Sequence, residues 1–417
     1  MSNGVFAMTS HATTLLLVLA LIIVLARALG AGARALGQPP VIGEVLAGVF
    51  VLPLLIDTGL ADGLFPTAIR ADLSALANIG VALFMFVVGM ELDGDLLRGK
   101  GKLAAAVSTA CIVLPLGLGV LLAWFLADAH APSQRTGFFV FLAVALSITA
   151  FPVLARILTD RGMQRTPVGS LALTCAAIND VFAWVLLAVA VTLTGQGQGN
   201  QWLVLLVFPY LAIMLWVVKP VLRRLLVDRG KLTPGALAVV IAGVLLSAAA
   251  TEWIGLHLIF GAFLFGVVMP RDGARELVHD KVAELNGVLL LPIFFIVAGL
   301  KVDLSAFSTA GFGELALILA CAIAGKFLGA FGAARLSGMS TRHSAVLGTL
   351  MNTRGLTELI VLSIGAELGL LDAKLYTLMV VMALVTTAMA GPLLAWLYPP
   401  SAITADLVAP RRAKTPA

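Results

Sequence analysis

The sequence is poor in charge and in cysteine. Only 12% of its 417 residues are charged, whereas soluble globular proteins carry about 25%. So few charges cannot cover the surface of a soluble protein of this length, and the 60% hydrophobic content excludes a disordered chain. The three cysteines, Cys111, Cys175 and Cys321, lie inside apolar runs, so they offer neither a disulfide framework nor a metal-binding spacing.

The start of the chain also lacks basic residues. No Lys or Arg precedes the first apolar run, and a cleaved signal peptide needs a basic start. We therefore interpret residues 13–30 as a retained membrane span. The mean hydropathy of +1.06 is typical of a polytopic membrane protein. The net charge of +5 then reflects basic cytoplasmic loops and not nucleic-acid binding.

Thirteen apolar segments, each bounded by charges, Pro or Gly, are candidates for membrane spans. They lie near 13–30, 40–56, 74–91, 103–126, 136–157, 167–194, 201–222, 233–251, 254–270, 284–300, 312–334, 343–366 and 374–396. The division of 233–270 into two spans depends on Glu252 and Gly255.

The distribution of basic residues supports this count. With the N-terminus outside, 21 Lys and Arg residues fall in cytoplasmic loops or the C-terminal tail and 4 fall outside. The sequence predicts an all-α, multi-pass protein of the inner or plasma membrane, with its C-terminus in the cytoplasm. Residues 1–396 form a single transmembrane domain, and 397–417 form a short cytoplasmic tail.

Two halves of the chain resemble each other. Residues 83–93 align with 293–303, and the Gly43–Gly48 spacing matches Gly261–Gly266, at offsets of 210 and 218. An odd number of intervening spans places the halves in opposite orientations. We therefore predict two inverted repeats, spans 1–6 and 8–13, which are typical of transporters that bind substrate near the midplane. Shared glycine-rich packing is the alternative explanation.

Few ionisable residues lie inside the predicted spans, where a central charge costs about 2.5–3.5 kcal/mol and usually has a function. Asp180 follows Asn179 in the middle of the sixth span and has no basic neighbour in sequence. Lys326, in the eleventh span, is its natural partner. Because burial disfavours a bare carboxylate, Asp180 is predicted to bind a proton or a dehydrated cation in competition.

Three further charges have less specific interpretations. Arg354 and Glu358 are four residues apart and are predicted to form a structural ion pair in the twelfth span. Glu44, near the start of the second span, is interpreted mainly as a capping or pairing residue.

Two spans contain helix breakers. Ser147-Ile148-Thr149-Ala150-Phe151-Pro152 interrupts the fifth span, and residues 352–355 (Asn-Thr-Arg-Gly) interrupt the twelfth. Pro152 removes a backbone donor, and the hydroxyls of Ser147 and Thr149 can satisfy the freed groups. An ordinary proline kink is the alternative. If both helices unwind, their ends can coordinate a cation near Asp180, with Ser147 and Thr149 as oxygen ligands.

At these residues the sequence resembles the monovalent cation/proton antiporter superfamily, in particular the plant-type cation/proton exchangers and bacterial potassium-efflux relatives. The resemblance covers nearly the whole chain through QPPVIGEVLAG (38–48), LFMFVVGMELD (83–93), ALSITAFPVLARIL (145–158), AAINDVFAWVLLAVAV (176–191), IFGAFLFGVVMPR (259–271), LLLPIFFIVAGLKVDLS (289–305) and LMNTRGLTELIVLSIG (350–365).

The resemblance implies a homodimer with a dimerisation bundle (spans 1–3 and 8–10), a linker (span 7) and a core bundle (spans 4–6 and 11–13). The core contains crossed, unwound helices and moves like an elevator. Asp180 then matches the ion- and proton-binding aspartate, and Lys326 matches the core basic residue. Asn179 replaces the second acid of electrogenic relatives, so the expected reaction is electroneutral exchange of Na⁺ or K⁺ for a proton.

Other functions fit less well. A sodium-coupled organic-solute symporter on a similar fold would need a roomier polar cavity. A membrane enzyme is disfavoured because HExxH, paired intramembrane aspartates and a Ser/His arrangement are all missing. No channel-filter motif is present either. No cofactor is predicted, and the metal expected at Asp180 is only the transported cation.

Overall fold

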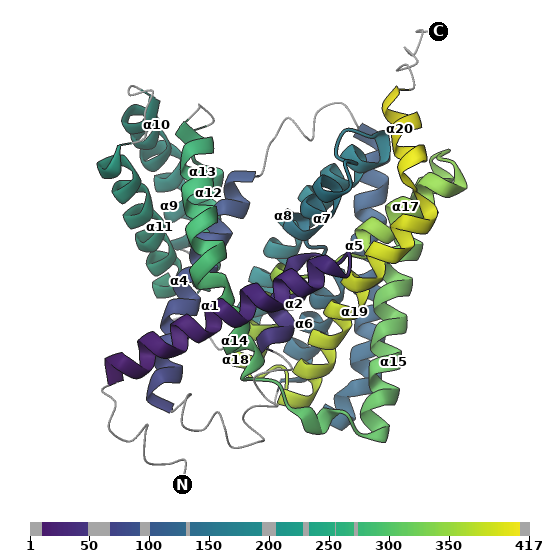
Figure 1. The fold of residues 1–417 in the computed structure, drawn as a ribbon, viewed down its shortest axis with the longest axis horizontal. Helices are drawn as coiled ribbons and strands as arrows, with labels where there is room; N and C mark the ends of the chain where they lie inside the picture. Colours follow the sequence, from purple (N-terminus) through teal and green to yellow (C-terminus); the bar gives the residue numbers. More distant parts are fainter. Residues whose placement is uncertain are drawn as a thin grey trace.

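The structure, a computed structural model, describes residues 11–48, 67–91, 101–130, 134–193, 206–227, 233–254, 256–270 and 274–408. Within these ranges the chain is entirely helical and contains no strand (Figure 1). The prediction of an all-α membrane protein is confirmed in this part of the chain.

Nine helical stretches among the described residues are long and apolar enough to cross a membrane. Four of the thirteen predicted spans are not among these nine. The spans predicted at 40–56 and 201–222 lie partly outside the described residues. The ninth forms the short helix α12 (Leu258–Val267), and the twelfth is broken. The predicted separation of the eighth and ninth spans is confirmed, because α11 (Pro234–Ile254) ends before α12 begins.

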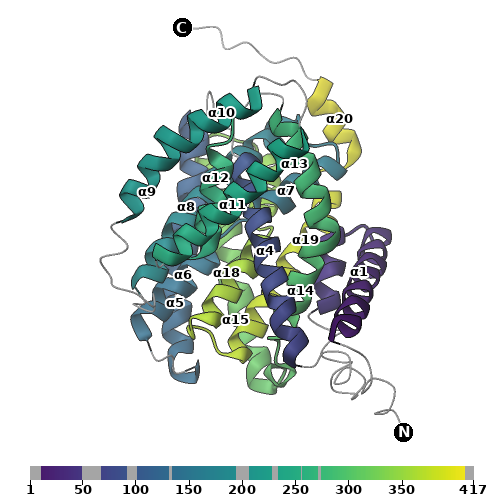
Figure 2. The ribbon, with the colours of Figure 1, turned by 90° about the vertical axis from the view of Figure 1, so that its left-hand side faces the viewer.

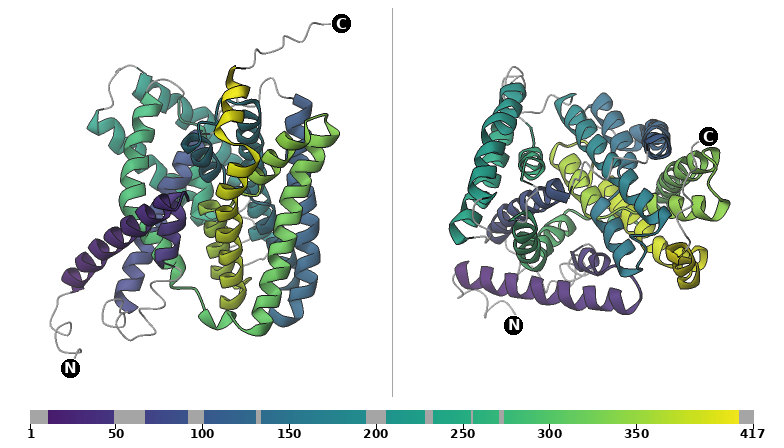
Figure 3. Two further views of the ribbon diagram at one scale, coloured as in Figure 1. Left: turned by 45° about the vertical axis from the view of Figure 1, so that its right-hand side comes forward. Right: turned by 90° about the horizontal axis from the view of Figure 1, so that it is seen from above.

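The first bundle is formed by α1 (His11–Ala35), α2 (Pro40–Leu46), α4 (Thr67–Glu91) and α11–α14. Here α13 (Ala274–Leu285), the π-helical segment η5 (Asn286–Leu290) and α14 (Leu291–Gly299) follow one another without a break. Glycines let these helices approach closely: a Cβ on Gly89 would lie 2.1 Å from the carbonyl oxygen of Phe263. Seen from above, α1 lies along the outside of this bundle (Figure 3).

The second bundle contains α5 (Gly101–His130), α6 (Arg135–Ser147), α7 (Phe151–Asp160) and α8 (Pro167–Leu193). It is completed by α15 (Thr309–Ile323), the π-helical segment η7 (Ala324–Leu328), α16 (Gly329–Leu336), α17 (Thr341–Met351), α18 (Leu356–Glu367) and α19 (Ala373–Leu397). Gly119 of α5 brings that helix against α6, since a Cβ there would lie 2.5 Å from the Cα of Ala143.

The remaining helices lie at the edges of the molecule. α9 (Val207–Ile213), η4 (Met214–Val218) and α10 (Lys219–Val227) form one helical run beside the first bundle (Figure 2). This run exposes large apolar side chains such as Phe208 and Trp216, as expected of a lipid-facing surface. The short helix α20 (Pro400–Val408) follows α19.

Both predicted helix breaks are present. α6 ends at Ser147 and α7 begins at Phe151, with Pro152 in its first turn, where proline is tolerated. α17 ends at Met351 and α18 begins at Leu356. The polar and Pro- or Gly-containing segments identified in the sequence are therefore the points at which these helices unwind.

Candidate ion and proton site

The two unwound segments meet inside the second bundle. The backbone amide of Ala150 donates a hydrogen bond to the carbonyl of Thr353 at 3.2 Å. The hydroxyl of Thr149 donates to the carbonyl of Met351 at 3.3 Å. Each break thus satisfies backbone groups that the other leaves without a helical partner, as buried polar groups in a membrane require.

Arg354 holds the end of α6 from the opposite break. Its guanidinium donates to the carbonyl oxygens of Ala145 (3.0 Å) and Leu146 (2.6 Å) and to Glu358 Oε2 (3.0 Å). Arg354 and Glu358 are both completely buried, and their predicted ion pair is confirmed. The C-terminal end of a helix carries partial negative charge, so a fixed cation there is stabilising.

Lys326 lies in η7 and contacts the same helix end. Its ammonium donates to the carbonyl of Cys111 (3.1 Å), the hydroxyl of Thr149 (2.7 Å) and the carbonyl of Ser147. Among the described residues no ion pair joins Lys326 to Asp180, although its charge acts on that carboxylate. The sequence suggested that Lys326 pairs directly with Asp180. That prediction is corrected, because the ammonium of Lys326 instead binds oxygens of α5 and of the break after α6.

Asp180 lies in α8 with only 1% of its surface exposed, next to the fully buried Asn179. Both carboxylate oxygens of Asp180, and both polar atoms of the Asn179 side chain, lack a hydrogen-bond partner among the described residues. The backbone amide of Phe151, at the start of α7, is near enough to interact with Asp180. A buried carboxylate in this state is costly unless it takes up a positive partner.

The two candidate oxygen ligands are already engaged. The hydroxyl of Ser147 donates to the carbonyl of Val144 at 2.7 Å, while the hydroxyl of Thr149 contacts Lys326 and Met351. Both side chains keep lone pairs, but their observed role is to complete the crossing.

One residue of the crossing, Thr387, was not identified from the sequence, and a second, Gly355, was predicted only as part of the helix break. Thr387, in α19, places its hydroxyl 3.0 Å from the amide of Arg354 and 2.6 Å from its carbonyl oxygen, and so braces the second break. Gly355 has a φ of +159°, and a Cβ there would lie 2.6 Å from the side chain of Val153. Two adjacent threonines, Thr386 and Thr387, in a mostly apolar span were the sequence signal that could have identified Thr387.

Glu44 lies on α2, beside Gly30 of α1. The charges of Arg27, Arg156 and Arg34 act on its carboxylate, and its capping or pairing role stays a prediction. No group of three or more His, Cys, Asp or Glu side chains within the described ranges has the arrangement of a metal site.

This fold, with two broken helices crossing beside a buried aspartate, defines a membrane transporter. The family model described as sodium/hydrogen exchanger, transmembrane, matches residues 13–398, and the chain belongs to this family. The family is one of transporters and not of enzymes.

Particular relatives are cation antiporters. The chain is 39% identical over 403 residues to the Na⁺/H⁺ antiporter NhaS4 of Synechocystis, covering 93% of this chain and 98% of the relative. It is 38% identical to cation/H⁺ antiporter 20 of Arabidopsis thaliana, covering 92% and 48%, and 33% identical to K⁺/H⁺ antiporter 1 of Saccharomyces cerevisiae, covering 87% and 44%. The chain thus spans about half the length of these plant and yeast relatives.

A solved structure supports the fold. The sodium proton antiporter MjNhaP1 from Methanocaldococcus jannaschii, determined at pH 8, superposes with a TM-score of 0.71. The superposition covers 96% of this chain and 100% of the MjNhaP1 chain. At 15% sequence identity it shows a shared fold alone.

Proposed function

We propose that this chain exchanges Na⁺ or K⁺ for protons across a membrane, and that Asp180 binds the two ligands in competition. The observation that carries the proposal is a carboxylate with 1% exposure and, among the residues that the structure describes, no hydrogen-bond partner on either oxygen, beside the crossing of two broken helices. Membership of the sodium/hydrogen exchanger family and the similarity to relatives named as Na⁺/H⁺ and K⁺/H⁺ antiporters support antiport.

One charge balance follows from the residues around Asp180. Asn179 is neutral, and Lys326 is bound to backbone and hydroxyl oxygens, so neither adds a second exchangeable proton in this arrangement. A single carboxylate carries either one monovalent cation or one proton in each direction. We therefore infer electroneutral exchange, with the loaded site able to change sides and the empty, charged site held back by the cost of burying it.

We further propose an elevator-like alternation of the second bundle, as core, against the first bundle, which forms the homodimer contact. One set of contacts between the bundles lies at the ends of α14 and α18 and the start of α19, and the side chain of Gln38, before α2, also donates to the carbonyl of Ala388 midway along α19 at 3.2 Å. Lys301 Nζ lies 2.9 Å from Glu367 Oε1, and the hydroxyl of Tyr376 donates to the carbonyl of Ala298 at 3.0 Å.

The remaining topological proposals follow from the sequence. Thirteen spans, two inverted six-helix repeats, an external N-terminus and a cytoplasmic C-terminus agree with the basic-residue distribution. The helical run α9–η4–α10 links the two repeats.

Symport of an organic solute has less support. The small cavity lined by Gly355, Leu359 and Thr387, next to the second break, has a volume of about 10 Å³. That space holds about one water molecule, so it cannot hold an organic solute.

Dissipation of a pH gradient in everted vesicles tests the proposal, with Na⁺, K⁺ and Li⁺ added in turn. Asp180→Asn should abolish the response to every cation. Asp128→Asn is a matched control, because Asp128 is 87% exposed and pairs with Arg135 at the surface. Exchange by the Asp180 variant at the unaltered rate would disprove the assignment of the site.

Stoichiometry needs a separate measurement. Proteoliposomes on a solid-supported membrane should give no transient current on addition of the transported cation, and an imposed potential should leave the rate unchanged. A current that scales with the rate would show that a second charge moves.

A further inference from the structure

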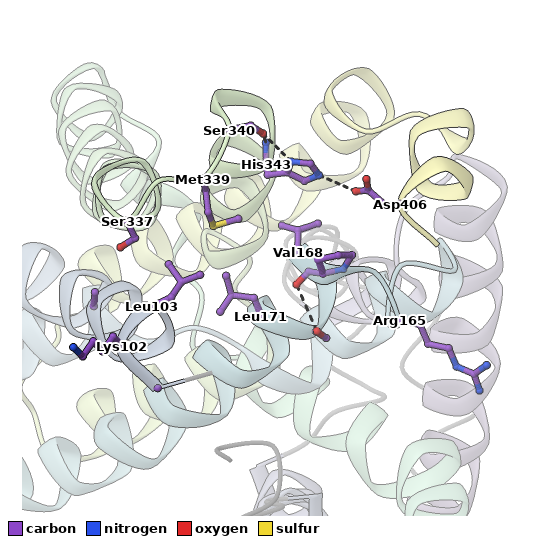
Figure 4. A pocket seen from close by; sticks show the side chains of 14 residues that line it. Lys102, Leu103, Arg165, Val168, Leu171, Ser337, Met339, Ser340, His343 and Asp406 are labelled. Atoms are coloured by element: carbon purple, nitrogen blue, oxygen red, sulfur yellow. Dashed lines mark hydrogen bonds and ion pairs between the residues drawn. The ribbon is translucent and has the colours of Figure 1, made fainter. Parts of the chain in front are cut away.

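A large cavity lies at one end of the second bundle, away from Asp180. Its volume is about 1340 Å³, and it lies where α5, α8 and α17 begin, beside α20 (Figure 4). α5 and α8 are membrane-length helices, so their first turns mark the edge of the apolar slab. The cavity therefore lies at the depth of lipid headgroups.

The rim of this cavity is basic. Lys102 and Arg165 stand on opposite sides of it, and both are exposed (Figure 4). Neither makes an ion pair with a carboxylate among the described residues, whose ion pairs involve other basic side chains. Partial positive charge from the amino ends of α5 and α8 adds to theirs.

Asp406 is the one acidic side chain among the described residues that line the cavity, and it is already occupied. Asp406, from α20, accepts a hydrogen bond from His343 Nε2 at 2.8 Å and another from the hydroxyl of Tyr398. It is therefore poorly placed to neutralise Lys102 and Arg165, and the cavity keeps an excess of positive charge.

The floor of the cavity is apolar. Leu103 of α5, Val168 and Leu171 of α8, and Met339 before α17 line it between the two basic residues (Figure 4). A free phosphate or other small anion would gain nothing from such a surface. A ligand with one anionic group and a hydrocarbon tail matches both parts of the lining.

We propose that this cavity binds an anionic phospholipid, with its headgroup at the basic rim that Lys102 and Arg165 form and an acyl chain over Leu103, Leu171 and Met339. Basic pockets between membrane helices are suited to anionic headgroups. Because the cavity is lined by helices of the second bundle together with α20, bound lipid would stabilise the packing of α5, α8 and α17. The inference does not depend on which cation the protein transports.

Thermal unfolding of the purified full chain in a neutral detergent tests this proposal. Phosphatidylglycerol should raise the Tm, whereas phosphatidylcholine, inorganic phosphate and sn-glycerol 3-phosphate should not. Native mass spectrometry should then retain one more phosphatidylglycerol on the wild type than on Lys102→Ala/Arg165→Ala. The double variant should bind it about 30-fold more weakly, from roughly 1 kcal/mol per basic residue.

A double variant elsewhere provides the matched control. Arg223→Ala/Arg224→Ala removes two exposed charges from α10 and should keep the full shift. Unchanged phosphatidylglycerol binding by Lys102→Ala/Arg165→Ala, with its lipid-free Tm intact, would refute the site. If inorganic phosphate alone raised the Tm, the ligand would be a soluble phosphate and the lipid assignment would be wrong. If the lipid-free Tm falls, Lys102→Glu and Arg165→Glu as single variants repeat the comparison.

Discussion

The ammonium of Lys326 lies 2.7 Å from the hydroxyl of Thr149, and both groups are buried at the end of α6. The lysine thereby connects η7 to the first helix break, while Arg354 connects the second break to the same helix end. Two cations thus hold one set of α6 carbonyls. In this arrangement Lys326 supports the geometry around Asp180 without pairing with it.

Replacing Lys326 with alanine should therefore lower stability more than turnover. The variant loses three hydrogen bonds from a charged donor, each worth about 1.5–3 kcal/mol, and leaves the Ser147 carbonyl unsatisfied. Thermal unfolding and vesicle exchange, measured together, check this. Lys219→Ala, at an exposed position in α10, is the control and should be near wild type. Full stability with lost exchange would instead give Lys326 a coupling role.

The ion pair of Arg354 and Glu358 gives a second prediction. Glu358→Gln leaves a completely buried guanidinium without its carboxylate, at a cost of about 3–5 kcal/mol. Arg354→Met/Glu358→Leu should recover only part of that loss, because Arg354 also holds the carbonyls of Ala145 and Leu146. Urea unfolding of the purified variants measures both differences. Complete recovery in the double variant would mean that those carbonyl contacts contribute nothing.

Gly355 limits how closely the two breaks can approach. Gly355→Ala would place a Cβ 2.6 Å from the side chain of Val153, so we expect slower exchange and a lower Tm. Gly332→Ala is the matched control, since no atom lies within 4 Å of its Cβ position in α16, and it should be neutral or stabilising by up to about 1 kcal/mol. Wild-type behaviour of both variants would contradict the tight crossing.

Asp372 predicts a pH dependence of stability outside the spans. Partial burial raises its pKa, but the hydrogen bond from His130, the amide of Leu375, and the charges of His130 and Lys374 hold the pKa below its usual value. Its stabilising contribution is present above the unfolded-state pKa of about 4 and is lost as pH falls through the lowered folded-state value. Asp372→Asn should thus be less stable than wild type at pH 7, with the gap closing towards pH 3. A gap independent of pH would assign the effect to helix capping alone.

Relative movement of the two bundles can be tested by cross-linking. Lys301→Cys/Glu367→Cys, in a Cys321→Ser background, joins the bundles through a short bis-methanethiosulfonate, and exchange should stop until reductant is added. His130→Cys/Glu314→Cys, within the second bundle, is the control and should transport when bridged. Continued exchange by the first cross-linked pair would exclude the elevator-like movement.

The sequence predicted those features that depend on side-chain type. Pro152 and the polar residues 352–355 identified both breaks, and the four-residue spacing identified the Arg354–Glu358 pair. The partners of Lys326 could not be read, because every residue supplies a carbonyl and only the fold selects which ones remain unpaired. The helix that contains the tenth span begins earlier than the predicted start at 284. Hydropathy could not show this, because the charged residues of α13 precede the apolar segment on the same continuous helix.

The glycine contacts of the first bundle have a practical consequence. A Cβ on Gly299 would lie 2.0 Å from the carbonyl oxygen of Gly48, and one on Gly266 would lie 2.1 Å from that of Phe86. Backbone meets backbone at these points, so no neighbouring rotamer can make room for a methyl group. Engineering that aims at higher expression or better crystals should leave these seams untouched and vary the lipid-facing surface of α9 and α10 instead.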